Sequence, residues 1–207
     1  MVNLKPTGEK PLIIDWSQNI IQTKIVYYGP AMSGKTESIR ALFKYLNILS
    51  RLESIETTSG RTLFFDYGPI ELVHGDWVIQ IHIWSATGQD YYAETRSTVL
   101  AGTDGIVFVA DSNPSLIHEN LRCWEELKGF FGPRLSTSIP VVFALNKRDL
   151  WPAISQFDFV NALELNGFSL IFETVATQGT FVVEVLQEML RSILLGSNLA
   201  QPKKIGT

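Results

Sequence analysis

The chain has 207 residues, of which 45% are hydrophobic and 18% are charged, a balance typical of a soluble protein with one globular core. Its formal net charge of −4 argues against broad nucleic-acid binding, because no surplus of lysine and arginine is present to replace the counterions of a phosphate backbone. The single cysteine, Cys123, excludes a disulfide framework and a thiolate metal cluster, and we expect it to be a buried small hydrophobic residue in a reducing compartment.

Residues 1–15 are expected to form an irregular N-terminal arm, because prolines and Gly8 stand there among polar residues. The stretch 12–21 is compatible with a short strand and with an ordered extension that lies across a sheet. The first definite strand is predicted at 23–28, a β-branched and aromatic run.

Residues 29–36 read Gly-Pro-Ala-Met-Ser-Gly-Lys-Thr and fit the phosphate-binding pattern G-x-x-x-x-G-K-[S/T]. The two glycines let the backbone turn its N–H groups toward phosphate oxygens, and the helix that follows adds the positive end of its dipole. Lys35 can reach the β- and γ-phosphates as a catalytic cation, while the Thr36 hydroxyl can hold Mg²⁺. The expected nucleotide contacts in this segment are Gly29, Ala31, Met32, Ser33, Gly34, Lys35, Thr36 and Glu37.

Apolar residues at three- and four-residue steps predict a helix over residues 35–50, with its apolar face in the core. A polar, turn-rich stretch follows at 54–60, and we expect a mobile loop there. Strands are then predicted at 62–67 and 77–84. The connection at 68–76 is bracketed by Gly-Pro and Gly-Asp, so the two strands are expected to form an antiparallel hairpin.

Two continuous apolar runs, at 105–110 and 139–145, are bounded by turn residues and predict strands that are buried on both faces of a parallel sheet. Strand and helix alternate along the chain, so we expect right-handed crossovers and a ligand at the carboxyl ends of the strands. Residues 196–207 are expected to form a loose tail. Helices are predicted at 114–130, 155–165 and 178–195.

The residues Asn-Lys-Arg-Asp at 146–149 follow the second buried strand, where a nucleotide base would lie beside the sheet. The Asp149 carboxylate can accept hydrogen bonds from N1–H and the N2 amino group of guanine, a donor pair that adenine lacks. Asn146 is expected to brace the loop, and Lys147 to lay its stem over the base. The alternative for these residues is a charged, solvated turn.

These motifs, in this order, resemble those of the small Ras-like GTPases. Over roughly residues 16–195 the chain is more similar still to the Mgl-type prokaryotic GTPases, the MglA-like cell-polarity switches. The resemblance implies one Ras-like domain at 16–195 with an α/β, three-layer P-loop NTPase fold: a mostly parallel six-stranded sheet with one antiparallel edge hairpin strand, and helices on both faces. It is carried by residues 24–30, 61–67, 88–89, 105–111 and 146–150.

The resemblance also implies roles for further residues. The hydroxyl and backbone of Thr62 would meet Mg²⁺ and the γ-phosphate, and Gln89 of the pair Gly88-Gln89 would orient the attacking water. Arg61 matches an arginine that in Mgl-type proteins acts as a finger from within the same chain; the alternative is a surface charge on a loop. Ala176, followed by Thr177, would offer its backbone N–H to guanine O6, although many Ras-like proteins have lysine at the latter position.

Two other positions depart from the Ras-like pattern. Ser85 stands where the pattern has an aspartate that supports Mg²⁺ through water, so the metal is expected to depend more on Thr36, Thr62 and the phosphates. Ala31 replaces a glycine near the γ-phosphate, which implies slow hydrolysis without a partner.

The chain is therefore expected to be a GTPase that orders two loops, at about 50–62 and 86–98, around GTP and Mg²⁺ and releases them on hydrolysis to GDP. The resemblance implies a roadblock-type, MglB-like regulator as partner and a role in polarity, motility or trafficking. Tyr91 and Tyr92 are either partner anchors or simple packing residues. The strand at 62–67 is expected to be a sheet edge that can receive a partner strand.

Two other functions are open from the residues. A nucleotide-binding scaffold without turnover is suggested by Ser85 and Ala31 and opposed by Gln89 and Arg61. An ATP-dependent kinase or ATPase would share the phosphate loop but would not need Asp149.

The sequence also suggests where the protein works. No apolar run approaches the ~18 residues of a membrane span. Val2 stands where N-myristoylation needs glycine, and no cysteine is available for a prenyl group near the C-terminus. A cytoplasmic protein without a direct membrane anchor is expected.

Overall fold

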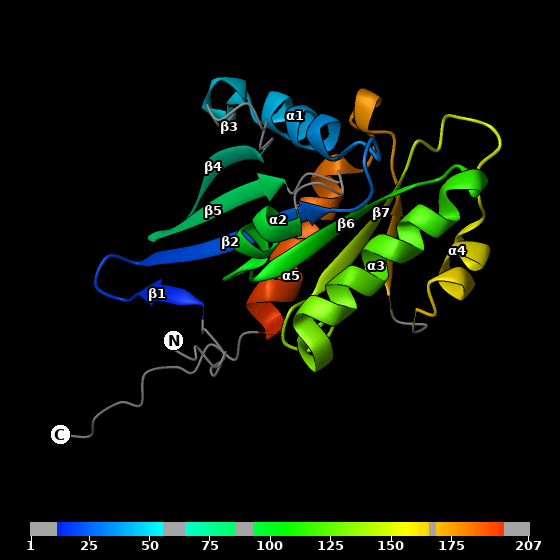
Figure 1. Ribbon diagram of the computed structural model, residues 1–207. Coiled ribbons are helices and arrows are strands. Elements are labelled where there is room, and N and C mark those ends of the chain that lie inside the picture. The colour runs from blue at the N-terminus through cyan, green and yellow to red at the C-terminus, as the bar shows by residue number, and fades with distance from the viewer. Residues whose placement is uncertain (1–11, 56–64, 86–92, 166–168, 197–207) are drawn as a thin grey trace.

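The computed structural model describes residues 12–55, 65–85, 93–165 and 169–196. The strands are β1 (Ile13–Asp15), β2 (Ile20–Tyr28), β3 (Glu53–Ile55), β4 (Phe65–His74), β5 (Trp77–Ser85), β6 (Gly105–Asp111), β7 (Val141–Asn146) and β8 (Leu170–Glu173). They form one twisted sheet in the order β3-β4-β5-β2-β6-β7-β8, with β1 added by pairing with β2 (Figure 1). The pairs from β5 through β2, β6 and β7 to β8 are parallel, whereas β1–β2, β3–β4 and β4–β5 are antiparallel.

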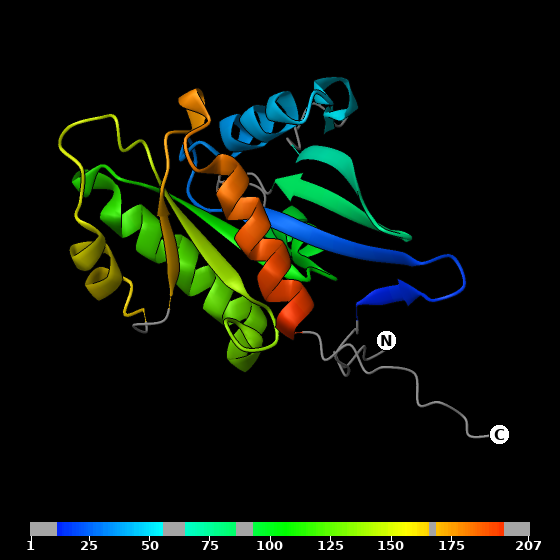
Figure 2. The ribbon, with the colours of Figure 1, turned by 180° about the vertical axis from the view of Figure 1, so that it is seen from behind.

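Helices cover both faces of this sheet, as Figures 1 and 2 show from opposite sides. The longer ones are α1 (Lys35–Tyr45), α2 (Ala93–Leu100), α3 (Ile117–Phe131), α4 (Gln156–Ala162) and α5 (Val182–Gly196). Apolar side chains of α1 and α5 pack on one face, and those of α2, α3 and α4 pack on the other. The predicted α/β fold with helices on both faces of a mostly parallel sheet is therefore confirmed.

The two apolar runs form β6 and β7, neighbouring interior strands of the sheet. Every residue of β6 and of β7 is buried, because helices cover both faces there. The core splits along the strand alternation: Ile106 and Phe108 face α3, while Val107 and Val109 face α1 and α5. This arrangement aligns the carboxyl ends of β2, β6 and β7 at one edge of the sheet, where the predicted site residues lie.

The sheet differs from the prediction at its antiparallel side, and the described residues form eight strands instead of the predicted six. β4 continues to His74, so Gly68 and Pro69 lie within the strand and the turn is made by Gly75 and Asp76. β3 pairs with Phe65–Tyr67, so the described part of the predicted 62–67 edge is already covered. Among the described strands, the stretch of β4 without a second partner is 68–74, a position that tolerates proline because no outward N–H is needed.

The N-terminal prediction of an irregular arm is wrong for Ile13–Asp15, which pairs with β2 as a strand. β2 itself begins at Ile20, three residues earlier than the predicted 23–28. The strand alternative for the stretch 12–21 is therefore the one the structure has. The turn between β1 and β2 is closed by Asp15, whose side chain accepts hydrogen bonds from Ser17.

Helix ends also differ from the prediction. α1 ends at Tyr45, and a separate 3₁₀ turn follows at Leu49–Arg51. α5 begins only at Val182, because a 3₁₀ turn at Ala176–Gln178 and the left-handed Gly179 precede it. α2 occupies Ala93–Leu100, although a loop was predicted for 86–98. The helix was not predicted because few of its residues are apolar.

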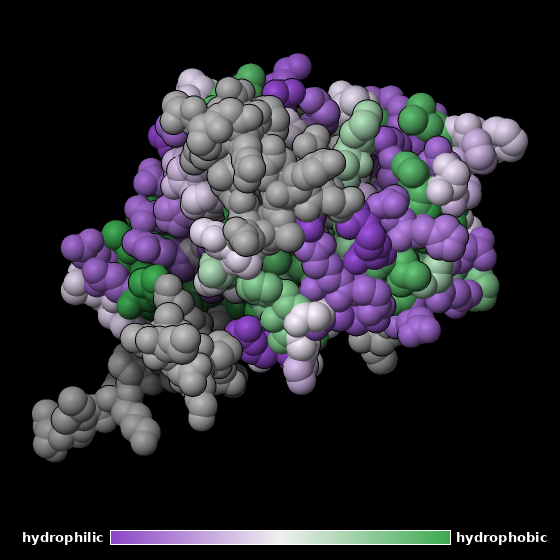
Figure 3. Space-filling model, viewed as in Figure 1, coloured by the Kyte–Doolittle hydropathy of each residue, from purple (hydrophilic) through white to green (hydrophobic). Residues whose placement is uncertain are grey.

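The surface agrees with a helix-covered sheet. In the view of Figure 3, the surface in the region of α3 is mostly hydrophilic. The exposed ion pair Glu119–Arg122 lies on this helix. Cys123, on the inner face of the same helix, is buried as predicted. None of the helices in the described parts of the chain has the length and hydropathy of a bilayer-crossing segment.

Candidate functional site

The phosphate-loop segment, residues 29–36, leads from the carboxyl end of β2 into the start of α1, at the edge of the sheet predicted for a ligand. Its two glycines have left-handed backbones, with φ of 143° at Gly29 and 103° at Gly34. A Cβ on Gly29 would lie 2.2 Å from the carbonyl oxygen of Val109, and one on Gly34 would lie 2.1 Å from Nδ2 of Asn146. Both positions therefore require glycine for conformation and for space.

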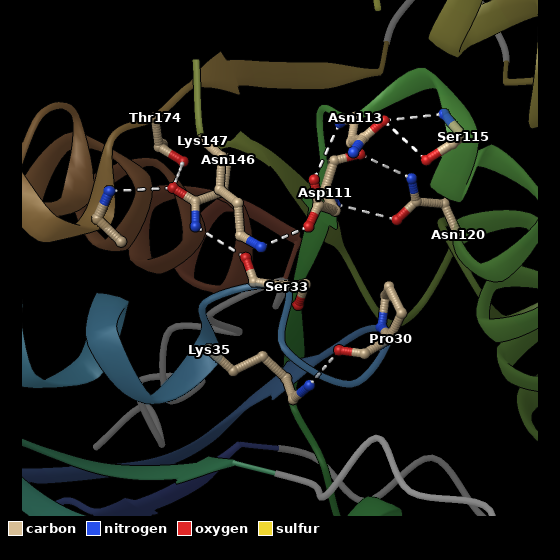
Figure 4. A network of polar contacts seen from close by, with 11 residues as sticks. Pro30, Ser33, Lys35, Asp111, Asn113, Ser115, Asn120, Asn146, Lys147 and Thr174 are labelled. Carbon is tan, nitrogen blue, oxygen red and sulfur yellow. Dashed lines mark hydrogen bonds and ion pairs between the residues drawn. The ribbon is translucent and has the colours of Figure 1, made fainter. Parts of the chain in front are cut away.

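Lys35, the first residue of α1, points back into this loop (Figure 4). Its ammonium donates hydrogen bonds to the carbonyl oxygens of Gly29 at 2.9 Å and Pro30 at 2.6 Å. The residue is only 7% exposed, and burial lowers the pKa of this ammonium from 10.5 to about 8. Burying this cation inside the loop costs desolvation free energy. A polyanionic ligand bound beside the ammonium would offset that cost.

Thr36, the next residue, contacts an acid that sequence reasoning missed. Its hydroxyl donates to Oδ2 of Asp66 at 2.6 Å, and the hydroxyl of Ser85 donates to the same oxygen at 3.1 Å. Asp66 lies on β4 and is 7% exposed. The antiparallel pairing of β4 with β5 brings it beside Ser85, the position from which the expected aspartate is missing. The available signal was that Asp66 belongs to the stretch 61–67 on which the resemblance rests.

Asn146 joins the two halves of the site. Its Nδ2 donates to the carbonyl oxygen of Ser33 at 2.8 Å. Its Oδ1 accepts from the hydroxyl of Thr174 at 3.2 Å and from the backbone N–H of Ala176 at 3.0 Å (Figure 4). Both polar atoms of the side chain are therefore engaged, and it fastens the loop after β2 to the loop after β8.

The loop after β7 is pinned on one side and open on the other. Arg148 donates to the carbonyl oxygen of Ile154 at 2.5 Å and pairs with Glu173 at 2.9 Å, which fixes the backbone of the loop. Lys147 turns the other way and pairs with Asp111 at 2.6 Å. Asp149 is exposed and has no polar partner among the described residues, so both of its carboxylate oxygens can accept hydrogen bonds from a ligand.

Several predicted residues lie at the rim of this arrangement or beyond it. Ala31 and Met32 are exposed on the outer turn of the phosphate-loop segment, and Thr177 is exposed after Ala176. Glu37 is also exposed, and its carboxylate pairs with Arg40 at 2.8 Å. The predicted residues Arg61, Thr62, Gly88 and Gln89, with Tyr91 and Tyr92, lie outside the described residues.

The site offers oxygen ligands for a hard divalent cation. Thr36 provides a hydroxyl and Asp66 a buried carboxylate within hydrogen-bond distance of each other. Oxygen atoms of this kind are what Mg²⁺ prefers, and it retains several water molecules when it binds. No group of three or more His, Cys, Asp or Glu side chains gathers within the described parts of the chain. The chemistry of these two oxygen donors therefore fits such a cation.

Comparison with known proteins finds relatives that match most of the length of the chain. No protein-family model matches the sequence. Over 188 residues the chain is 33% identical to "Mutual gliding-motility protein MglA" of Myxococcus xanthus, a match that covers 87% of this chain and 95% of that protein. Over 175 residues it is 28% identical to "ADP-ribosylation factor-like protein 6" of Caenorhabditis elegans and of Caenorhabditis briggsae, covering 82% of this chain and 85% of each relative.

Proposed function

This chain belongs to the small Ras-like GTPases, in their MglA-like branch, and from that premise we propose that its GTP cycle controls a polarity, motility or trafficking process in the cytoplasm. The protein binds guanine nucleotide and hydrolyses GTP, as members of this family do. The process is proposed because the relative with 33% identity is named for gliding motility. The observation that best supports a nucleotide site is the position of the Asn146 side chain. It fastens the phosphate-loop segment to the loop after β8, and these two loops, with the loop after β7, would surround the nucleotide.

At the phosphate end, the backbone N–H groups of residues 31–34 and the ammonium of Lys35 hold the β- and γ-phosphates. Lys35 exchanges its two carbonyl partners for phosphate oxygens, which are stronger acceptors. Thr36 and Thr62 hold Mg²⁺, and Asp66 supports it in place of the acid that Ser85 replaces. When bound, Mg²⁺ neutralises charge on the phosphate oxygens.

At the base end, Asp149 accepts hydrogen bonds from N1–H and the N2 amino group of guanine. The stem of Lys147 lies over the base, and its ammonium is directed to Asp111. The backbone N–H of Ala176 already donates to Asn146, so guanine O6 shares this donor and has the N–H of Thr177 beside it. The exposed carboxylate of Asp149 supports this assignment, because it has no competing partner in the described structure.

Hydrolysis depends on residues of the two segments expected to change with the nucleotide, 50–62 and 86–98. Gln89, after Gly88, orients the attacking water, and Arg61 neutralises charge in the transition state, an effect worth about 10³-fold or more in rate. The Ala31 methyl group makes turnover slow in the absence of a partner. An MglB-like, roadblock-type regulator that contacts the segments 50–62 and 86–98 accelerates it.

The scaffold alternative loses part of its basis. It was suggested by Ser85, but the carboxylate of Asp66 lies within hydrogen-bond distance of that serine hydroxyl. Single-turnover phosphate release from the wild type and from Gln89→Leu separates the two functions. A GTPase predicts a wild-type rate above the protein-free blank and a slower variant, whereas equal rates near the blank would favour the scaffold.

The nucleotide itself can be identified directly. The purified protein is denatured by heat, and the small molecules it releases are separated by anion-exchange chromatography. GDP or GTP is expected, because Asp149 complements the donor pair of guanine. Release of an adenine nucleotide would contradict the proposed base site.

A further inference from the structure

Asp111 ends β6 beside the loop after β7, and its contact with Lys147 has so far been given without a role. Its Oδ2 lies 2.6 Å from the ammonium of Lys147. The side chain of Asp111 is 3% exposed, whereas that of Lys147 is 30% exposed. Figure 4 shows the lysine running from the end of β7 across to the end of β6. The pair therefore has one buried, fixed member and one long, adaptable member.

The buried member is held by a network from α3. Asn120 is 0% exposed; its Oδ1 accepts from the backbone N–H of Asp111 at 3.1 Å and its Nδ2 donates to the backbone carbonyl at 2.9 Å. Oδ1 of Asp111 accepts from the backbone N–H of Asn113 at 2.9 Å. One carboxylate oxygen is thus occupied by the chain, and the other is left to face Lys147. The orientation of the carboxylate is set before any ligand arrives.

Lys147, the flexible residue of the pair, needs a fixed partner for its ammonium. Lys147 has φ of 67°, in the left-handed region that a side chain with a Cβ rarely adopts, and its stem has four rotatable bonds. A free lysine at this position would lose much side-chain entropy on packing against a flat ligand. Pairing with Asp111 restricts the stem in advance, so less freedom remains to be lost when a base binds. It also balances a positive charge that would otherwise attract the phosphate tail to the wrong end of the site.

We propose that Asp111 is a positioning residue for guanine recognition: it fixes the ammonium of Lys147 and thereby holds the lysine stem along the plane of the base. This inference rests on the proposed nucleotide site. Asp111 does not touch the nucleotide, and its effect passes through Lys147. Asn120 extends the effect to α3, because it holds the backbone of Asp111 on both sides.

A double-mutant cycle tests the proposal. The variants are Asp111→Asn, Lys147→Met and their combination, and the measurement is the dissociation rate and Kd of a fluorescent GDP analogue. Asparagine keeps an oxygen for the N–H of Asn113 but presents an amino group to Lys147. We expect Asp111→Asn to weaken GDP and GTP binding equally, by roughly tenfold, the value of one charge-assisted hydrogen bond. In the Lys147→Met background the same change should have an effect below twofold.

Two readouts separate positioning from a merely structural role. Single-turnover hydrolysis of bound GTP should be unchanged in Asp111→Asn, because the γ-phosphate end is not altered. Glu119→Gln, which removes an exposed ion pair on the same α3 helix, serves as the matched control and should leave the GDP affinity unchanged. An equal loss of affinity with and without the Lys147 ammonium would overturn the proposal, as would a wild-type affinity in Asp111→Asn. Failure of the wild type to bind GDP would instead contradict the proposed function.

Discussion

The hydroxyl of Thr36 donates a hydrogen bond to the carboxylate of Asp66 at 2.6 Å, although the two residues come from α1 and from the antiparallel side of the sheet. The same carboxylate oxygen accepts from Ser85 on the neighbouring strand β5. The acid that the Ras-like pattern has on β5 is thus present in space but is carried by β4. A carboxylate moved by one strand can still face the hydroxyl of the phosphate-loop segment, because adjacent strands lie only about 5 Å apart.

This relationship predicts how Mg²⁺ dependence changes. Asp66→Asn should raise the Mg²⁺ concentration for half-maximal GTP hydrolysis by about tenfold, since a neutral amide supports a hydrated cation less well than a carboxylate. The double variant Asp66→Asn with Ser85→Asp should recover most of this loss, because it returns the acid to β5. Glu71→Gln, an exposed acid on the same strand β4, is the control. An unchanged Mg²⁺ requirement in Asp66→Asn would contradict the assignment.

Base selection should depend on Asp149. Asp149→Asn replaces one acceptor oxygen with an amino donor, so GDP affinity should fall about 100-fold, and xanthosine diphosphate, which carries an acceptor in place of the N2 amino group, should bind better than to the wild type. Competition of both nucleotides against fluorescent GDP measures this. The exposed turn residue Asp76 provides the control Asp76→Asn. A variant with the wild-type preference for guanine would show that another residue reads the base.

Nucleotide binding should be linked to protonation of Lys35. Burial lowers the pKa of this ammonium to about 8, whereas phosphate oxygens favour the charged form and raise it again on binding. At pH 8 about half of the free protein carries a neutral Lys35, so binding of GDP should take up about half a proton, and the uptake should vanish near pH 6. Titration calorimetry in buffers of different ionisation enthalpy measures this number.

Arginine at this position remains protonated throughout, so Lys35→Arg should abolish the uptake even if it weakens binding. Lys44→Arg, on the exposed part of α1, should leave it unchanged. Proton uptake in Lys35→Arg equal to that of the wild type would assign the titration to another group.

Gly34 should tolerate no side chain. Gly34→Ala places a methyl group 2.1 Å from Nδ2 of Asn146 at a φ of 103°, so we expect a loss of about 2 kcal/mol or more in the free energy of unfolding and no measurable GDP binding. Gly129→Ala is the matched control, because it lies in α3 with open space around the new methyl group and should stabilise the protein slightly. Denaturant unfolding of both variants checks this. Equal stabilities would show that Asn146 moves aside.

The parts of the fold that could be predicted are those with a local physical signature. The buried runs of β6 and β7 are apolar at every position because helices cover both faces, and α3 carries its apolar residues at helical spacing. The helix α2 lacked such a signature, since it holds few apolar residues and buries the cation Arg96 in an ion pair with Glu126 on α3. The covering of Phe65–Tyr67 by β3 was equally hidden, because a three-residue strand is defined by its partner.

The sequence by itself determined the phosphate-loop segment and the guanine motif, because each needs neighbouring residues at fixed spacing on a strand end, and that spacing is readable in one dimension. Only the tertiary structure decided which distant groups meet there. The register between β4 and β5 brought Asp66 to Thr36, and the parallel alignment of β2, β6 and β7 brought Asn146 to Ser33 and Lys147 to Asp111. These contacts depend on strand pairing and packing between segments far apart in the chain, for which no local pattern is required.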